Sequence, residues 1–387
     1  MAQPLGVAGA RRGAYLDTLA TSHRVTWDYQ VLDLDDRRVG GAPAPADGQI
    51  TVDAAAEVTR TWSGALLDPD HRLRLDSDAP GAGAVFGDRL LRIRHTITVP
   101  DPDDRFGGPF PVTVTPFTGR MTKLDRDGDQ VAIECQGLEV FGLTGCVPLT
   151  LSKGTRVVAA IEKILRARMG HRRFRFPQGI KARLARDVTV GWADDARPWV
   201  VATRLARSID MQLYMAGDGY AVLRRPPGRA AHVFAWPGHI TTEPKISYAL
   251  GTANIVIVHG KKGVTAKADA SDLRPRHSLS AAAMARHGVP IYVPHLIDDD
   301  KIATTSAAKK LADSTLKRLL REQATVTFDA VPVYHLDELD LVATRTPDTR
   351  LVTPLRQATL PTGATGDMAV GYVRNIAEPS VRRRRRR

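Results

Sequence analysis

The segment DRDGDQVAIE, from Asp125 to Glu134, has acidic residues at a spacing similar to that of a calcium-binding loop. Such a loop has its glycine directly after the third acidic ligand and a glutamate at its twelfth position. Here Gly128 comes early, before the third acid, and Glu134 is only the tenth residue. The Asp-Gly pair is typical of a tight turn, so the segment favours a hairpin over a metal site.

Histidines and paired acids are the other residues with the chemistry of a reactive site. The histidines that flank turns or short apolar runs are His232, His239, His287 and His295. None of them stands in an HExxH frame or beside an acid at a metal-ligand spacing. The chain also has no Walker loop, G-x-S-x-G elbow or dinucleotide fingerprint. We therefore expect no catalytic residue, cofactor or metal.

Positive charge is concentrated in two places. The net charge is +13, and subtracting the six terminal residues Arg382–Arg387 leaves +7. Between Lys153 and Arg186, eleven basic residues stand against the single acid Glu162. This asymmetry predicts an anionic partner, but charge alone does not choose among nucleic acid, a membrane surface and an acidic protein face.

The sequence RRFRF at 172–176 allows two interpretations. Its phenylalanines could stack on bases while its arginines hold phosphates, or an alternating strand could turn the phenylalanines inward and the arginines outward. We favour the strand, and we expect its outward arginines to bind an acidic partner. The residues that we predict at a protein interface are Arg172, Arg173 and Arg175, with the terminal Arg382, Arg383, Arg384, Arg385, Arg386 and Arg387.

The domains that position these residues can be predicted from the length of the chain, which is sufficient for two or three of them. Of its 387 residues, 43% are hydrophobic and 25% charged, which indicates a globular protein. No apolar stretch approaches the roughly 20 residues that cross a bilayer, and the N-terminal residues lack the apolar region of a secretory signal. We expect a soluble protein without a membrane anchor, with Cys135 and Cys146 as free thiols.

Residues 14–145 favour strands. Apolar and polar residues alternate with period two, and Gly/Pro clusters lie between the runs. The predicted strands are 24–34, 50–58, 90–99, 112–117 and 130–135. Many short strands with such turns indicate a small barrel or sandwich.

The periodicity then becomes helical. A stripe of apolar residues predicts a helix over 155–169 that stops at Gly170. A second helix is predicted over about 197–209, with Asp194 or Asp195 as its cap and Pro198 in its first turn. A hairpin with the turn GDG at 217–219 follows.

The last third returns to strands around one clear helix. The helix is predicted over 304–321, with caps offered by Thr304 to Ser306. Strands are predicted at 253–260, 324–328, 339–343 and 367–376, and a long loop at 261–289.

The pattern predicts a β-rich α+β protein with two small antiparallel β-barrel domains and an inserted α/β module. The predicted boundaries are 1–150 for the first barrel, 151–232 for the module, 233–378 for the second barrel and 379–387 for the arginine tail.

The order of four segments resembles the tail-tip hub proteins of long-tailed phages, the family of trimeric baseplate hubs and tail-associated proteins. The segments are the strand run that leads into ITVDAAAEVTRTWSGALLDPD, the hairpin TPFTGRMTKLDRDGDQVAIECQG, the helix at 155–169 with ARPWVVATRLARSIDMQLYMAGDGYAVLRR, and TSAAKKLADSTLKRLL followed by VPVYHLDELDLV. Each motif is loose, and their order over most of the chain carries the resemblance.

The resemblance implies a structural, non-enzymatic protein at the tail tip of a virion, assembled in the host cytoplasm. Three copies would form a ring in which two barrels per copy imitate sixfold symmetry. The ring would join distal tail, tail tube and tape-measure proteins to a central fibre, around a channel that DNA passes without specific binding. The predicted interface arginines would then face neighbouring subunits or the exterior, because phosphate contacts in the channel would retain DNA.

Three alternatives stay open. The chain could be another tail component, such as a sixfold distal ring or an adhesin. It could bind nucleic acid through the basic stretch 153–186. It could also be a hydrolase whose carboxylates meet only in space.

Overall fold

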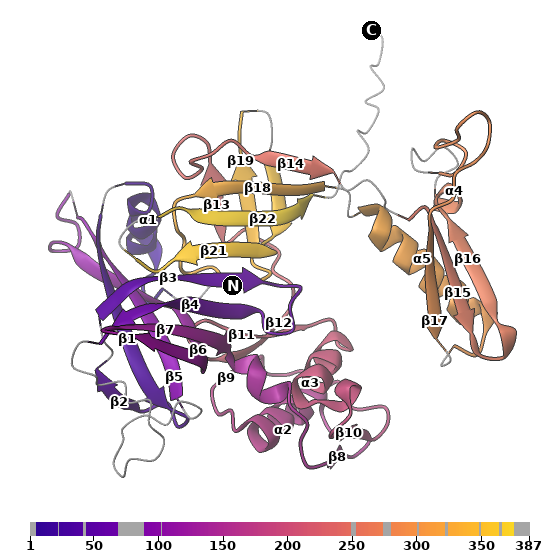
Figure 1. Cartoon of the computed structure of the whole chain (residues 1–387), viewed down its shortest axis with the longest axis horizontal. Helices are drawn as coiled ribbons and strands as arrows, with labels where there is room; N and C mark the ends of the chain where they lie inside the picture. Colours follow the sequence, from indigo (N-terminus) through magenta and orange to yellow (C-terminus); the bar gives the residue numbers. More distant parts are fainter. Residues whose placement is uncertain are drawn as a thin grey trace, which may run out of the picture. The chain divides into compact units, whose positions relative to one another are not determined.

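The computed structural model describes residues 5–21, 23–41, 44–68, 89–101, 103–248, 253–273, 280–299, 302–321, 324–347, 350–363 and 366–374. The chain divides into two compact units. Unit 1 comprises residues 1–243 and 328–370, and unit 2 comprises 244–327 with the residues from 371 onward. The boundary between them falls within two strands, β18 and β22 (Figure 1).

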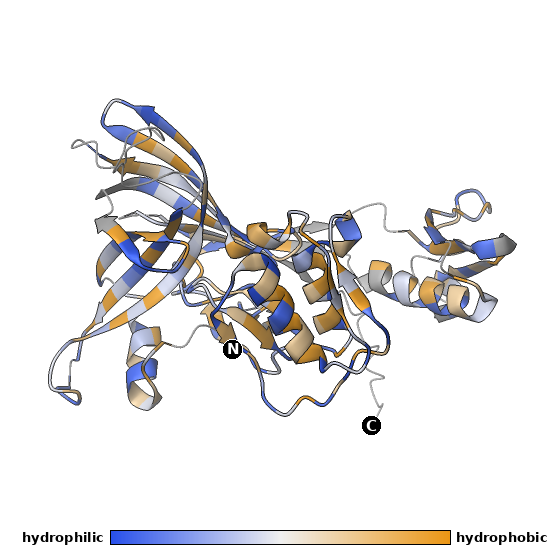
Figure 2. Cartoon of the chain, turned by 90° about the horizontal axis from the view of Figure 1, so that it is seen from below, coloured by the Kyte–Doolittle hydropathy of each residue, from blue (hydrophilic) through white to orange (hydrophobic). Residues whose placement is uncertain are grey.

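The N-terminal part of unit 1 is an antiparallel sheet preceded by helix α1 (Gly9–Thr18). Its strands follow the order β3-β4-β7-β6-β5-β1-β2. Their bounds are β1 Arg24–Asp33, β2 Arg38–Gly41, β3 Ala44–Asp53, β4 Arg60–Leu67, β5 Arg89–Val99, β6 Phe110–Asp127 and β7 Gln130–Gly137. Hydrophilic and hydrophobic residues alternate along these strands (Figure 2), because successive side chains point to opposite faces.

The next part of unit 1 is a helical module. Its elements are η2 Leu138–Gly142, β8 Leu149–Leu151, α2 Val157–Met169, β9 Phe174–Arg175, β10 Val188–Val190, η3 Asp194–Ala196, α3 Pro198–Arg207, β11 Gln212–Met215 and β12 Ala221–Arg224. Helices α2 and α3 bury their apolar stripes in one core, with Ile161, Ile164 and Ala202 fully covered. Gly170 ends α2 with a left-handed φ of 66°, as predicted for a glycine stop.

Unit 1 is completed by strands from residue 232 onward. They are β13 His232–Ala235, β18 Ala324–Ala330, β19 Leu341–Arg345, β20 Arg350–Pro354, β21 Gln357–Pro361 and β22 Met368–Arg374, of which β18 and β22 reach across the unit boundary. Strand β21 pairs antiparallel with β3, which joins residues some 300 positions apart into one sheet. Strands β13, β19 and β20 form a separate three-stranded sheet.

Unit 2 contains a three-stranded sheet in the order β16-β15-β17 with helix α5 packed on it. Its elements are β14 Lys245–Tyr248, β15 Ile255–Gly260, η4 Lys261–Gly263, β16 Thr265–Asp269, α4 Ala270–Leu273, β17 Pro294–Asp299 and α5 Thr305–Arg321. The predicted cap of α5 is confirmed, since Thr304 Oγ1 accepts a hydrogen bond of 3.2 Å from the Ala307 amide. Among the described residues no helix combines the length and the apolar character needed to cross a membrane.

The β-rich α+β class is confirmed. Most predicted strands and helices agree within two residues at each end, but the strand predicted at 50–58 is β3 at Ala44–Asp53, and the strand predicted at 112–117 is part of the much longer β6. The largest sheet runs in an open order from β14 to β2, and no closed barrel is formed by the described strands. The two barrels therefore stay a prediction.

Two local predictions are wrong. The segment 261–289 is not one long loop, because it contains β16 and α4. Neither Asp194 nor Asp195 caps α3, since both lie in η3 and Arg197 occupies the cap position without a side-chain hydrogen bond. Asp194 instead forms an ion pair of 2.6 Å with Arg197.

A buried ionic cluster joins the three parts of unit 1. Arg60 of β4 lies 3.0 Å from both Asp337 and Glu338 in the segment before β19. Arg224 of β12 pairs with Asp340 at 2.7 Å. All of these carboxylates are buried, so the cluster connects the first sheet, the module and the C-terminal strands through charges that water does not screen.

Candidate functional site

The predicted interface arginines of the RRFRF segment are the starting point for the site. Arg173 forms an ion pair of 2.6 Å with Asp36, and Arg175 forms one of 2.5 Å with Asp218. Both guanidinium groups also lie over the ring of Tyr220, at 4.3 Å and 3.9 Å from its centroid. These two arginines are therefore held in place by partners within unit 1.

Asp36 is the residue that organises this site. It lies in the turn between β1 and β2 with a left-handed φ of 70°, a conformation that Asp tolerates better than most residues. Its carboxylate pairs with Arg173 of the module and with Arg92 of β5. One aspartate thus receives two arginines from different elements.

A pocket of about 420 Å³ opens beside these ion pairs. Four arginines and two aspartates contribute to its lining, together with His171 and apolar residues such as Phe141. The charged residues are Arg37, Arg92, Arg172, Arg173, Asp35 and Asp36. The pocket has an excess of positive charge, which suits a carboxylate or phosphate group because guanidinium donates bidentate hydrogen bonds to both.

The favoured interpretation of RRFRF is confirmed in part of the segment. Phe174 and Phe176 pack against the core of the module, and β9 covers only Phe174 and Arg175. Arg172 is exposed, whereas Arg173 and Arg175 are half-buried. The terminal residues Arg382–Arg387 lie outside the described residues.

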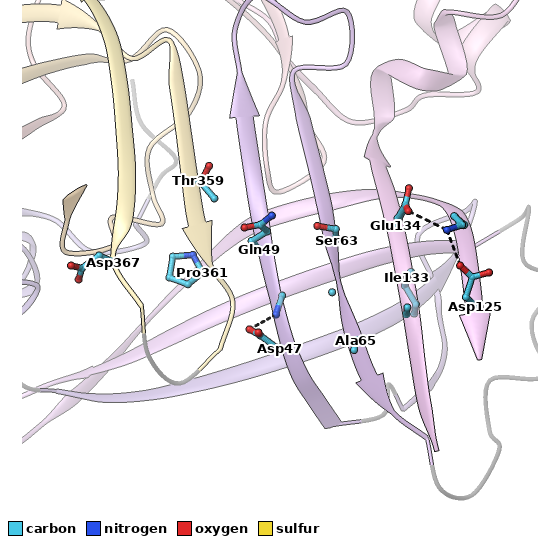
Figure 3. Close-up of a pocket in the computed structure, with 14 residues that line it drawn as sticks. Asp47, Gln49, Ser63, Ala65, Asp125, Ile133, Glu134, Thr359, Pro361 and Asp367 are labelled. Atoms are coloured by element: carbon cyan, nitrogen blue, oxygen red, sulfur yellow. Dashed lines mark hydrogen bonds and ion pairs between the residues drawn. The ribbon is translucent and has the colours of Figure 1, made fainter. Parts of the chain in front are cut away.

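A second hollow lies on the outward face of the large sheet, over β3, β4, β7 and β6 (Figure 3). Its volume is about 580 Å³, and small residues such as Ser63, Ala65 and Ala132 form its floor. We call it the acid-rimmed hollow, because Asp47, Asp125, Glu134 and Asp367 line it.

The charges of the acid-rimmed hollow are not balanced. Among the described residues that line it, Lys123 alone is basic, and it lies 2.8 Å from Asp125 and 3.6 Å from Glu134. The hydrogen bond to Asp125 raises the pKa of Lys123. Asp367 accepts a hydrogen bond of 2.7 Å from Thr241. The four carboxylates exceed the single ammonium, so this face attracts a basic partner.

Sequence reasoning did not find this hollow. The signal that could have found it is the run of small residues at alternate, outward positions of two strands. Ser63 and Ala65 lie on β4, which was not among the predicted strands, and Ala132 lies on β7, which was. Their juxtaposition depends on strand register, which the sequence does not specify.

Other reactive groups are used in packing. Burial lowers the pKa of His232 to about 3 and that of His335 to about 4, and the His232 ring contacts Phe234 at 4.7 Å. The Asp127–Gln130 segment is the β6–β7 turn, with Gly128 at a φ of 59°. In the described part of the chain, no group of three or more His, Cys, Asp or Glu residues could hold a metal.

Comparison with known proteins gives a fold and no sequence family. No family model matches the sequence, and no curated protein matches it either. Among solved structures, the 43 kDa tail protein of prophage MuSo2 from Shewanella oneidensis aligns with a TM-score of 0.58 at 11% identity. That alignment covers 90% of this chain and 99% of the tail protein.

The tail protein from Neisseria meningitidis MC58 aligns equally well, with a TM-score of 0.58 at 11% identity. Here the alignment covers 90% of this chain and 96% of the other. The chain therefore has the fold of phage-type tail proteins, which confirms the resemblance stated from the sequence at the level of the fold.

Proposed function

We propose that the protein is a structural, non-enzymatic subunit of a phage-type tail, and that three copies form the hub ring at the tail tip. In this proposal it is part of the virion and contacts distal tail, tube and tape-measure proteins on one side and a central fibre on the other. The DNA passes through the ring without specific binding.

The observation that carries the proposal is the extent of the structural match. Both tail proteins are matched over nearly their whole length, and 90% of this chain takes part. The likeness therefore includes the order of sheet, module and second group of strands, and not one common motif alone. A shared fold does not by itself fix function, so the ring, the copy number and the partners need a direct test.

The arrangement of strands supports a threefold ring. Strands β1 to β7 form one group and β13 with β18 to β22 form another, with the helical module between them in the sequence. We propose that each group is one of the two predicted barrels. Two similar groups per copy would let three copies present six similar surfaces.

The pocket beside Asp36, which Arg37, Arg92, Arg172 and Arg173 line, supports an assembly role for the module. Arg172, Arg173 and Arg175 would face a neighbouring tail protein or the exterior, and an acidic side chain of the partner would enter the pocket. A position in the channel is unfavourable, because every arginine–phosphate contact strengthens DNA binding.

The test is the copy number. Native mass spectrometry of the purified chain over a range of concentrations should give trimers, and electron microscopy of the trimer should show a ring. A hexamer would favour the alternative of a distal tail ring. A chain that stays monomeric at every concentration would overturn the hub assignment.

A further inference from the structure

The sheet β13-β19-β20 has one covered face and one open face. On the covered face His232, Phe234 and Val342 are buried, and the ring of Phe234 meets that of Phe328 at 5.5 Å. On the open face Val233 and Val352 are 41% and 52% exposed. The strand pairing places Val233 opposite Ala343 and Ala343 opposite Val352, so these three residues form one row across the sheet.

One neighbouring row of this face is apolar as well, whereas the other contains Arg345 and its register partner Arg350. The apolar row contains Ala231, Leu341 and Pro354, since the Ala231 amide bonds to the Leu341 carbonyl and Leu341 is the register partner of Pro354. Exposed apolar patches of this kind mark interaction sites, because leaving them in water costs free energy.

A basic side chain lies at the margin of the open face. Arg345 is exposed and is the register partner of Ala235. A protein surface that covers this face would therefore need a small, recessed centre for the two valines and an acidic margin for the arginine.

The acid-rimmed hollow has these properties. Strand register places Asp47, Ala65, Ala132 and Asp125 in one row across β3, β4, β7 and β6. The two alanines form the recessed centre and the two aspartates form the ends (Figure 3). The next row contains Gln49, Ser63, Glu134 and Lys123.

We propose that the open face of β13-β19-β20 docks on the acid-rimmed hollow of a second copy of this chain. Val233 and Val352 would fill the space above Ala65 and Ala132, and Arg345 would pair with an aspartate at the end of that row. The interface is heterologous, since the two surfaces differ, and a heterologous contact closes into a ring when its rotation permits. This inference rests on the proposed ring and names the surfaces that build it.

The first experiment measures assembly of the full chain with one substitution on each surface. Val352→Asp places a carboxylate against the acidic row, and Ala132→Trp fills the hollow. Each should raise the dissociation constant of the trimer at least about 30-fold, which corresponds to a hot-spot residue. Val289→Asp is the matched control, because Val289 is 66% exposed in unit 2, and it should leave assembly unchanged.

The second experiment tests which surfaces meet. Cys146 is replaced by serine, since it is the accessible one of the two free cysteines, and Val352→Cys and Ala65→Cys are made in separate chains. The two variants are mixed and left to exchange subunits, so that trimers contain both. A short bis-maleimide should then link the two variants into dimers, and it should link neither variant alone. Trimers that form normally without such a link would overturn this inference and leave the proposed function standing. Monomers throughout would overturn both.

Discussion

The contacts of Thr59 indicate which carboxyl group of the buried cluster of unit 1 is protonated. Thr59 Oγ1 lies 2.7 Å from Glu139 Oε1 and 3.0 Å from Glu338 Oε1. A threonine hydroxyl has a single hydrogen to donate, so one of the two carboxyls must carry a proton for both contacts to be favourable. Burial is the main cause that raises the pKa of Glu139 to about 7, which makes Glu139 the group that holds it.

We predict that Glu139→Gln reduces the pH dependence of stability. The pKa of Glu139 is raised in the folded state from 4.5 to about 7, so folding takes up a proton between these values and stability falls as pH rises through this window. A glutamine at this position does not titrate, so the free energy of unfolding of the variant should fall less steeply with pH than that of the unchanged chain. The two slopes should differ by up to about 1.4 kcal/mol per pH unit inside the window.

Urea unfolding at several pH values between 5 and 8 measures this difference. The buried histidines act in the opposite direction, since burial lowers the pKa of His95 and His232 to about 3 and their stabilisation grows as pH rises towards the unfolded value. They are the same in both proteins and cancel in the comparison. Equal pH slopes for the two proteins would show that Glu139 is ionised in the folded state.

At the scale of elements, Arg60 joins a strand to a segment far away in sequence. It donates to Asp337 and Glu338, 277 and 278 residues later, and to the Pro116 carbonyl at 2.6 Å. Its side chain is 2% exposed. The segment from Val331 to Asp340 has no regular structure, so these hydrogen bonds, rather than a ladder, fix it against β4.

We predict that Arg60→Ala destabilises unit 1 by about 3–5 kcal/mol, because removing one partner leaves buried carboxylates without a counter-charge. The matched control is Arg94→Ala, on β5 of the same sheet. Arg94 pairs with Asp28 at 3.8 Å and is 43% exposed, and exposed pairs contribute only about 0–1 kcal/mol. Chemical denaturation of both variants measures the difference, and similar losses would show that the buried cluster adds no special stability.

At the scale of the whole molecule, three of the eleven basic residues of the stretch 153–186 are paired with acids of the same chain. Arg173, Arg175 and Arg166 pair with Asp36, Asp218 and Glu162. The net charge of the sequence therefore overstates the field that the module presents to nucleic acid.

We predict that the double substitution Arg173→Ala with Arg175→Ala leaves DNA binding within about twofold of the unchanged chain, with the same salt dependence. Filter binding with duplex DNA at two salt concentrations measures both quantities. If these arginines contact phosphates instead, the salt slope would fall by about one for each, and the alternative of a nucleic-acid-binding protein would gain support.

Local pattern predicted much of the fold. The alternation of β5 and the helical stripe of α2 led to elements within a residue or two of those observed. The loop predicted over 261–289 failed because β16 is short and alternates only Ala266 and Ala268 with polar residues, which is a weak apolar signal. The segment before β19 contributed to the resemblance only through its order in the chain, and its sequence did not indicate that His335, Asp337 and Glu338 are buried.

The sequence by itself determined many of the helices and strands, the inward position of Phe174 and Phe176, and the resemblance to tail proteins, because periodicity and order are properties of neighbouring residues. Only the tertiary structure decided that Arg60 meets Asp337, that Asp36 receives two arginines, and that Ala65 and Ala132 share a hollow. Those contacts depend on strand register and on packing between distant segments, and a shift of one residue would turn every side chain of a strand to its other face.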